Sequence, residues 1–255
     1  MRLILFAILI LFSPCQLLRP ESHGIQVNYR DSVDVLNYSI HLTLRNLQDK
    51  KLEGFTVIKC VYPRGNQGSF AFDLAGLQVD SVTSPALKNV RFYQEKEIIR
   101  GTFSGKLTPA DTVTLAIYYR GTPLRDKRWG GFFFAGDEAF NYGIGMDAVP
   151  PNFGRVWFPC IDNFTDRATY TFHVTIPEGY TAVCNGTLCG KRESEPGYYT
   201  WAWEMKQPIP TYLASVAVGR YVRLEGLYHG LQRSIPWQIY CLPEDSMKTA
   251  ASFQQ

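Results

Sequence analysis

Histidine is the side chain most often used for proton transfer and metal binding, and this chain has four: His23, His41, His173 and His229. None begins a His-Glu-x-x-His pair, the spacing that places two imidazoles one helical turn apart for zinc. A Gly-x-Ser-x-Gly nucleophile motif and a phosphate-binding loop are also missing from the sequence. The residues therefore predict no catalytic group, no metal site and no cofactor in this chain.

The richest combination of side chains lies in residues 150–177, PPNFGRVWFPCIDNFTDRATYTFHVTIP. An aromatic and cysteine centre is flanked by charges: Arg155, Trp157, Phe158, Pro159, Cys160, Asp162, Asp166 and Arg167. We expect the bulky centre to anchor a loop against the core, since each buried aromatic ring contributes roughly 1.5–3 kcal/mol. We expect the four charged residues to hold the turn through charge-assisted hydrogen bonds. The alternative is that they are ordinary surface charges.

The cysteines suggest one cross-link. Cys184 and Cys189 flank Asn185-Gly186, the dipeptide that most strongly indicates a two-residue hairpin turn, so a disulfide between them would bridge that hairpin. Cys60 and Cys160 fit better as small buried apolar residues.

Alternation of apolar and polar residues dominates the elements that would position these groups. In residues 38–44 every second residue is apolar, which predicts a half-buried strand with His41 on its polar face. Similar segments follow at 55–62, 69–82 (two short strands), 111–119, 170–176 (with His173 on the polar face), 181–188 (the hairpin), 198–203 and 213–221. Strands at this spacing, with turn residues between them, predict an all-β sandwich of mostly antiparallel strands.

The C-terminus departs from this pattern. Pro243, Glu244 and Asp245 precede Met247 in a sequence typical of a helix start, with acidic residues in the first turn. We therefore expect residues 21–242 to form the β-sandwich domain and residues 243–255 to be the truncated start of a following domain. A frayed tail is the alternative.

The N-terminus has the pattern of an export signal. Met1-Arg2 is a short positive start, and an unbroken apolar run of ten residues, 3–12, follows it. Residues 1–20 are therefore predicted to be a signal peptide of a protein exported to the periplasm or the extracellular space. A lipoprotein anchor at Cys15 is an alternative that Pro14 disfavours, and a buried N-terminal helix is another. No later segment is long and apolar enough to cross a membrane.

Composition narrows the class of partner. Hydrophobic residues make up 45% and charged residues 19%, which excludes a disordered chain. Lys and Arg number 26 against 23 Asp and Glu, and without the two arginines of the first twenty residues the balance is 24 − 23 = +1. This near-neutral charge gives no electrostatic basis for binding nucleic acid.

Residues 150–177 resemble the N-terminal domain of the aminopeptidase N family of zinc metallopeptidases. The family pattern is matched in order by Arg155, Phe158-Pro159-Cys160, Asp162, Arg167, Ala168 and Tyr170. Segments 38–44, 182–188, 201–203 and 208–215 are also similar to family segments, so the resemblance spans roughly residues 33–240.

The resemblance implies a saddle-like β-sandwich that is followed, in family members, by a thermolysin-like catalytic domain. That domain carries His-Glu-x-x-His and a more distant Glu, which bind zinc and leave one position for water. None of these motifs is in this chain, which ends about where such a domain would begin. The implied partner is therefore a catalytic domain, in cis or as a separate chain. The implied role is to pack on it and wall the peptide cleft, so that peptide is bound only in the full assembly.

One family feature of the sandwich is altered here. The family's Gln-x-Glu pair, which contributes to the active site, falls on Ala148 and Pro150 when counted back from Cys160. Neither side chain binds an amino group, so the resemblance leaves Asp147 or the neighbouring backbone as the substitute.

A second hypothesis is a free-standing secreted binding module. Exposed aromatic residues at Trp129 and at Phe132-Phe133-Phe134 would then grip a glycan or a peptide. The alternative for that run is a strand or loop that packs on the missing domain, because it would otherwise leave a large apolar patch exposed.

Overall fold

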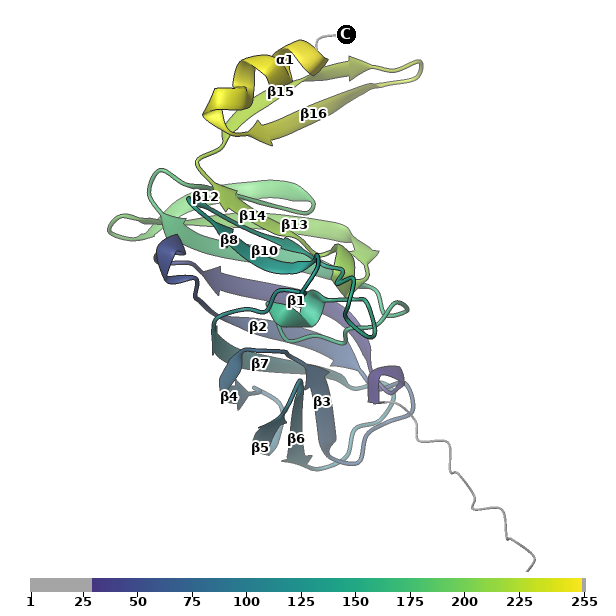
Figure 1. Cartoon of the computed structure of the whole chain (residues 1–255). Coiled ribbons are helices and arrows are strands. Elements are labelled where there is room, and N and C mark those ends of the chain that lie inside the picture. Colours follow the sequence, from purple (N-terminus) through teal and green to yellow (C-terminus); the bar gives the residue numbers. More distant parts are fainter. Residues whose placement is uncertain (1–28, 254–255) are drawn as a thin grey trace, which may run out of the picture.

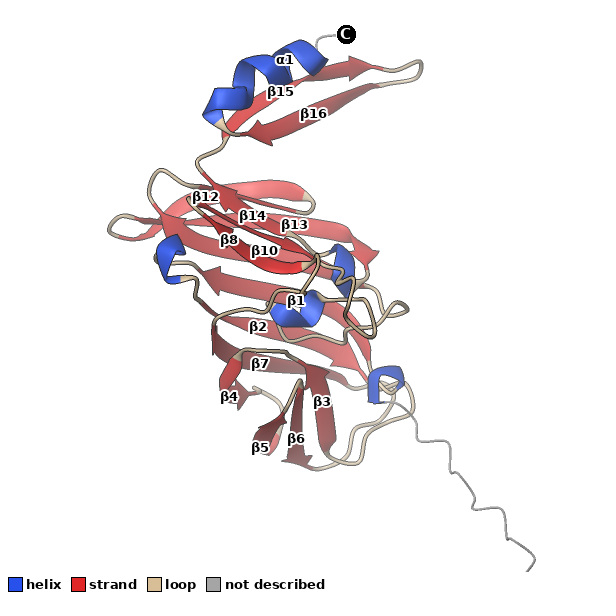
Figure 2. Ribbon diagram, viewed as in Figure 1, coloured by secondary structure: helices blue, strands red, loops and turns tan. Residues whose placement is uncertain are grey.

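The structure is a computed structural model, and it describes residues 29–253 (Figure 1). The predicted signal peptide at 1–20, with the alternative anchor at Cys15, lies outside the described residues. Within 29–253 the chain forms four sheets, with short helices between some of the strands (Figure 2). This confirms the all-β class and the mostly antiparallel pairing.

The largest sheet has seven strands in the order β12-β13-β10-β1-β2-β7-β4. Their bounds are β1 (Asp34–Thr43), β2 (Leu52–Val61), β4 (Gln78–Thr83), β7 (Thr112–Gly121), β10 (Ala168–Pro177), β12 (Thr187–Glu195) and β13 (Tyr198–Ile209). All neighbouring pairs in it are antiparallel except β1 and β10, which run parallel. The parallel pair joins strands from the two halves of the chain into one sheet.

Two smaller sheets pack on this one. The four-stranded sheet has the order β11-β14-β9-β8, and the three-stranded sheet has the order β3-β6-β5. Their bounds are β3 (Ser69–Asp73), β5 (Lys88–Glu95), β6 (Ile98–Ser104), β8 (Gly131–Ala135), β9 (Glu138–Tyr142), β11 (Thr181–Cys184) and β14 (Val216–Gly219). Strict alternation of buried and half-buried residues along β10 shows how the large sheet turns one face to the core and the other to solvent.

The last strands form a separate hairpin. β15 (Val222–His229) and β16 (Ser234–Cys241) pair only with each other among the described strands, and the short helix η5 (Pro243–Asp245) and α1 (Ser246–Phe253) follow. This unit lies at one end of the molecule, and the three-stranded sheet lies at the other (Figure 1). The helix start expected at Pro243 is thus confirmed, whereas the domain boundary at 242 stays a prediction. In 29–253 no helix has the length and apolar character needed to span a membrane.

Most of the predicted strands are present, but three strand pairs were missed: β5 with β6, β8 with β9, and β15 with β16. β5 and β15 have no buried residue: half-buried and exposed residues alternate along them, so neither has the strongly apolar face of the predicted strands. β8 contains three consecutive phenylalanines and shows no alternation at all. A strand whose alternate residues are only weakly apolar, or whose successive residues are all apolar, does not show a clear two-residue period in its sequence.

The hairpin predicted at Asn185-Gly186 is wrong. β11 pairs with β14 in the four-stranded sheet, and β12 pairs with β13 in the seven-stranded sheet, so the dipeptide is the corner where the chain changes sheets. The Asn185 amide donates to the Leu213 carbonyl at 3.1 Å and accepts from the Ser215 N–H at 2.6 Å. Gly186 has φ +91°, and a Cβ there would lie 2.0 Å from the Glu204 carbonyl oxygen. Turn chemistry of this type serves a tight corner as well as a hairpin.

A row of rings crosses the outward face of the large sheet. Tyr118 stacks on Phe55 at 5.0 Å, Phe55 on His41 at 4.1 Å, and His41 on His173 at 4.4 Å between ring centroids. The two histidines lie on the polar faces as predicted, but the stack leaves them only partly solvated. Burial, together with the neighbouring His173, lowers the pKa of His41 from 6.5 to about 4. Burial and Arg192 lower the pKa of His173.

We predict a pH-dependent stability that traces to His41. Because its pKa is lowered in the folded state, only the unfolded chain takes up this proton between about pH 6.5 and pH 4, so stability falls as the pH drops through that window. His41→Phe keeps a stacking ring without a titrating group, and its urea midpoint should fall less steeply across that range than that of the parent protein. His229→Phe, at an exposed position on β15, is the control and should match the parent. Parallel profiles for the parent and His41→Phe would contradict the prediction.

Candidate functional site

The segment that contains the predicted motif is a buried loop. It begins with the short helix η3 (Gly154–Val156), and Trp157 and Phe158 after it are 0% exposed. The Phe158 ring meets Tyr38 of β1 at 5.5 Å, and the Trp157 ring meets Phe132 of β8 at 6.4 Å. The loop therefore fills the space between the large sheet and the four-stranded sheet. Trp157 and Phe158 thus anchor the loop against the core, as expected from the sequence.

Arg155 and Asp162 form a buried ion pair inside this loop. Arg155 Nη1 lies 3.0 Å from Asp162 Oδ2, and the Arg155 backbone N–H donates to the same oxygen at 3.3 Å. The other carboxylate oxygen accepts from Thr211 Oγ1 at 2.7 Å, and Arg155 Nε donates to Glu97 at 3.1 Å. Asp162 is 1% exposed and Arg155 is 4% exposed, so each charge depends on these partners.

A second buried carboxylate, which the sequence reasoning missed, is Asp73 at the end of β3. Its backbone N–H donates to the Cys160 carbonyl at 2.7 Å, and its carbonyl accepts from the Cys160 N–H at 3.0 Å. Its carboxylate accepts from the Asp162 backbone N–H at 2.9 Å, from Arg30 Nε at 2.9 Å and from the Tyr29 hydroxyl. Burial raises the pKa of Asp73, while the hydrogen bonds from Arg30 and Tyr29 oppose that shift. In the sequence, the only indication that Asp73 is buried is its position as an acidic residue inside the otherwise apolar run 70–75.

The predicted motif thus divides into buried and exposed members. Arg155, Phe158, Pro159, Cys160 and Asp162 lie together in the buried loop. Arg167 is exposed and makes no ion pair with any described residue, so here the surface-charge alternative holds. Asp166 accepts from the Val35 N–H at 3.2 Å, and burial raises its pKa from 3.8 to about 6.

Asp147 lies at a surface hollow beside this loop. The hollow has a volume of about 600 Å³, and its lining is Glu97, Arg125, Asp126, Lys127, Asp147, Ala148, Val149, Phe153 and Arg155. The Asp147 carboxylate is partly exposed and lies 3.3 Å from Arg128 Nε, and its backbone N–H donates to Asp126 at 2.9 Å. Ala148, at the altered family position, lines the same hollow. We call this the Asp147 hollow.

An aromatic face adjoins it on the outward side of the four-stranded sheet. We define this face as Trp129, Phe133, Phe140 and Tyr142. Along β8 and β9 the alternate residues Phe132, Ala139 and Asn141 are buried, so the aromatic face points away from the core.

The rings of the aromatic face contact one another. Trp129 stacks on Tyr142 at 4.7 Å, and Phe133 stacks on Phe140 at 5.3 Å. Trp129 remains 46% exposed and Tyr142 41% exposed. The Arg125 guanidinium lies 4.3 Å from the Phe133 ring centroid and also lines the Asp147 hollow, which makes the two features continuous.

This arrangement corrects the expectation for Phe132-Phe133-Phe134. Phe132 is 1% exposed and packs toward Trp157, and Phe134 contacts Phe132 at 5.3 Å and packs against the core. Only Phe133 of the three is on the outward face, because successive residues of a strand point to opposite sides.

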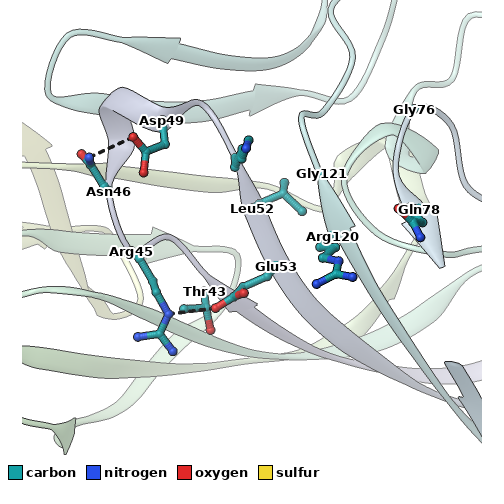
Figure 3. A pocket seen from close by; sticks show the side chains of 11 residues that line it. Thr43, Arg45, Asn46, Asp49, Leu52, Glu53, Gly76, Gln78, Arg120 and Gly121 are labelled. Atoms are coloured by element: carbon teal, nitrogen blue, oxygen red, sulfur yellow. Dashed lines mark hydrogen bonds and ion pairs between the residues drawn. The ribbon is translucent and has the colours of Figure 1, made fainter. Parts of the chain in front are cut away.

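A second hollow lies at the turn between β1 and β2, and Figure 3 shows its lining residues. It has a volume of about 510 Å³. Arg45 pairs with Glu53 at 2.9 Å and with Glu195 at 2.7 Å, and Arg120 pairs with Asp80 at 3.2 Å. It contains no residue that the sequence singled out, and its arginines are already neutralised by neighbouring carboxylates.

Neither a metal cluster nor the predicted disulfide is found in residues 29–253. No three His, Cys, Asp or Glu side chains of that range gather as a metal site. Cys184 is a buried thiol on β11 and Cys189 an exposed thiol on β12, both unpaired. The bridge was predicted from a hairpin, and the two strands belong to different sheets instead.

The buried ion pair gives a stability prediction. Arg155→Met should lower the free energy of unfolding by about 3–5 kcal/mol, because it leaves Asp162 buried without its counter-charge. Arg167→Gln, in the same motif but exposed, should change it by less than about 0.5 kcal/mol. Urea unfolding of the two variants and the parent measures both values. Similar losses of stability in the two variants would contradict the prediction that the buried Asp162 carboxylate depends on Arg155.

Thiol labelling tests the state of the two cysteines. In the native protein iodoacetamide should modify Cys189 and spare Cys184, because burial shields the Cys184 thiol and raises its pKa. Peptide mass spectrometry before and after unfolding distinguishes the two sites. If the Cys184 and Cys189 peptides stay linked and resist labelling until a reductant is added, the disulfide predicted from the sequence is present.

Comparison with known proteins assigns most of this chain to one family. The family model described as the Peptidase M1 N-terminal domain matches residues 36–213. Aminopeptidase B of Rattus norvegicus is 37% identical over 65 residues, which is 26% of this chain and 9% of that protein. Aminopeptidase N of Streptomyces lividans is 32% identical over 77 residues, 30% of this chain and 8% of that protein.

Solved structures show the same fold. An M1 zinc metallopeptidase of Deinococcus radiodurans, bound to a Tyr-Ser-Ala substrate, superposes with a TM-score of 0.73 at 22% identity over 86% of this chain and 52% of that chain. Legionella pneumophila aminopeptidase A, in complex with aspartic acid, gives 0.70 at 17% identity over 85% of this chain and 25% of that chain. This chain thus matches about half or less of the length of these proteins. Because the family model covers well over half of the chain, the chain belongs to the peptidase M1 N-terminal domain family.

Proposed function

We propose that this chain is the non-catalytic N-terminal β-sandwich domain of an exported zinc aminopeptidase. Its role is to pack on a catalytic domain that the present sequence does not contain and to wall one side of the peptide cleft. The observation that carries the proposal is the aromatic face beside the Asp147 hollow, in a domain of the M1 N-terminal family. Solvent-facing rings in contact with one another, continuous with a charged hollow, are typical of an interface next to a ligand site.

The residues of this chain do not fit the zinc that the family implies. His41 and His173 lie side by side, but no third ligand among residues 29–253 joins them. Zinc in structural and catalytic sites needs three or four protein ligands. The proposal therefore assigns zinc and the hydrolytic chemistry to the catalytic domain, and it assigns none of the bond-breaking steps to this chain.

The contribution of this chain would be binding and positioning. With a catalytic domain over the aromatic face, Trp129 and Tyr142 would lose their contact with water, and large aromatic residues of this kind carry most of the energy at interfaces. The Asp147 hollow would then open toward the cleft. Asp147 is the acid we assign to the amino end of the peptide, and it would exchange its contact with Arg128 for the ammonium group.

A second candidate is the free-standing module that binds a glycan or a peptide. It is favoured by one observation: Trp129 is stacked on one side by Tyr142 and still has 46% of its surface exposed. A rigid ring with a free face is a platform on which a sugar or a peptide side chain can stack.

The first test is activity. The purified chain with added zinc should not release an amino acid from a chromogenic aminoacyl amide, because none of the described residues form a metal site. Chelator-sensitive turnover by the chain alone would overturn the assignment of a non-catalytic role.

The second test is association with the catalytic domain encoded in the same genome, produced separately. Tyr142→Ser on the aromatic face should weaken binding at least about tenfold, the loss expected for a central interface aromatic. Tyr118→Ser is the matched control, because Tyr118 is 39% exposed against 41% for Tyr142 and lies on the outward face of the large sheet. Equal binding by the two variants would refute the interface, and glycan binding that depends on Trp129 would favour the second candidate.

A further inference from the structure

The chain contains three Asn-x-Ser/Thr sequences: Asn37-Tyr38-Ser39, Asn163-Phe164-Thr165 and Asn185-Gly186-Thr187. This tripeptide is the acceptor for N-linked glycans in exported proteins and requires a surface position. We propose that Asn163 is an N-glycan acceptor and that Asn37 and Asn185 are not. The inference rests on the export that forms part of the proposed function, and it concerns residues other than those of the aromatic face.

The side chain of Asn37 is hydrogen-bonded within the large sheet. It lies in β1, and its Nδ2 donates to Thr169 of β10 at both the carbonyl oxygen, 3.2 Å, and Oγ1, 2.9 Å. Thr169 Oγ1 in turn donates to the Leu36 carbonyl at 3.0 Å. A glycan on this nitrogen would break a bridge across the one parallel strand pair of the sheet.

The side chain of Asn185 is hydrogen-bonded within the corner where the chain changes sheets. Its Nδ2 donates to the Leu213 carbonyl and its Oδ1 accepts from the Ser215 backbone and hydroxyl, at 3.1, 2.6 and 3.3 Å. Gly186 beside it packs against the Glu204 backbone. A glycan on Nδ2 would replace one of its two hydrogens and would have to fit beside the Leu213 carbonyl that this nitrogen already contacts, at a crowded corner where even a Cβ on Gly186 would meet the Glu204 backbone.

Asn163 uses only its oxygen. Oδ1 accepts from the backbone N–H groups of Thr165, at 3.1 Å, and Asp166, at 2.7 Å, and closes the turn after the buried loop. Nδ2 donates to no residue in 29–253, and Phe164 and Thr165 next to it are exposed. Asn163 also borders an open hollow of about 440 Å³, which gives a sugar room beside the amide.

The chemistry of transfer preserves this turn. The new bond joins Nδ2 to C1 of the first sugar of a lipid-linked oligosaccharide. The C1–O bond to the polyprenyl diphosphate carrier breaks, the carrier leaves with the electron pair, and one Nδ2 proton passes to solvent. The Asn163 oxygen keeps both lone pairs, so the two hydrogen bonds that close the turn remain.

The test is secretion of residues 21–255 from a eukaryotic cell that attaches N-glycans, behind a heterologous leader so that the result does not depend on the native signal. Folded, secreted protein is treated with peptide-N-glycosidase in ¹⁸O water, and the occupied asparagines are identified by peptide mass spectrometry. Three variants remove one sequence each without altering its asparagine: Ser39→Ala, Thr165→Ala and Thr187→Ala.

We expect one glycan, at Asn163. Thr165→Ala should lose the enzyme-sensitive mass completely, while Ser39→Ala and Thr187→Ala should keep it unchanged. Folded protein with a glycan at Asn37 or Asn185, or with none at Asn163, would overturn the proposal. Failure of the native leader to export the chain, tested separately, would count against the proposed function and leave the Asn163 assignment intact.

Discussion

The rest of the structure depends on the requirement that two buried carboxylates be paired. Asp73 and Asp162 lie next to each other, joined through the Asp162 backbone N–H, and neither has access to water. An unpaired charge at such a depth costs several kcal/mol, so each needs its arginine. Arg30 binds Asp73 and Arg155 binds Asp162. These contacts bring together the start of the described chain, the end of β3 and the loop before β10.

Fixing this loop also fixes the surface beside it. Trp157 fills the space between the sheets and meets Phe132 of β8, so the buried side of β8 is set by the loop. The opposite side of the same strand then presents Phe133 outward, next to Arg125 at the Asp147 hollow. The aromatic face is thus a consequence of core packing. A surface held by a rigid core loses little conformational entropy when a partner covers it.

The charged motif shows how far residue type alone can be trusted. Arg155 and Arg167 are both arginines near Asp162 in the sequence, and both were expected to hold the turn. Arg155 does so because it lies on η3, inside the loop, whereas Arg167 immediately precedes β10 and faces solvent. Asp73 is the converse case, since nothing within its own segment reveals that it will meet residues of the distant loop. Which charges are buried follows from the path of the chain.

The sequence by itself determined the β class, the core face of the central strands and the helix start after Pro243, because each follows from side-chain order within a few residues. The tertiary structure alone decided which strands share a sheet. Asn185-Gly186 satisfies the chemistry of a hairpin, yet the chain turns there from one sheet into another, because β14 and β13 offer longer-range partners. The two-residue period states which face of a strand is buried, and it carries no information about the neighbouring strand.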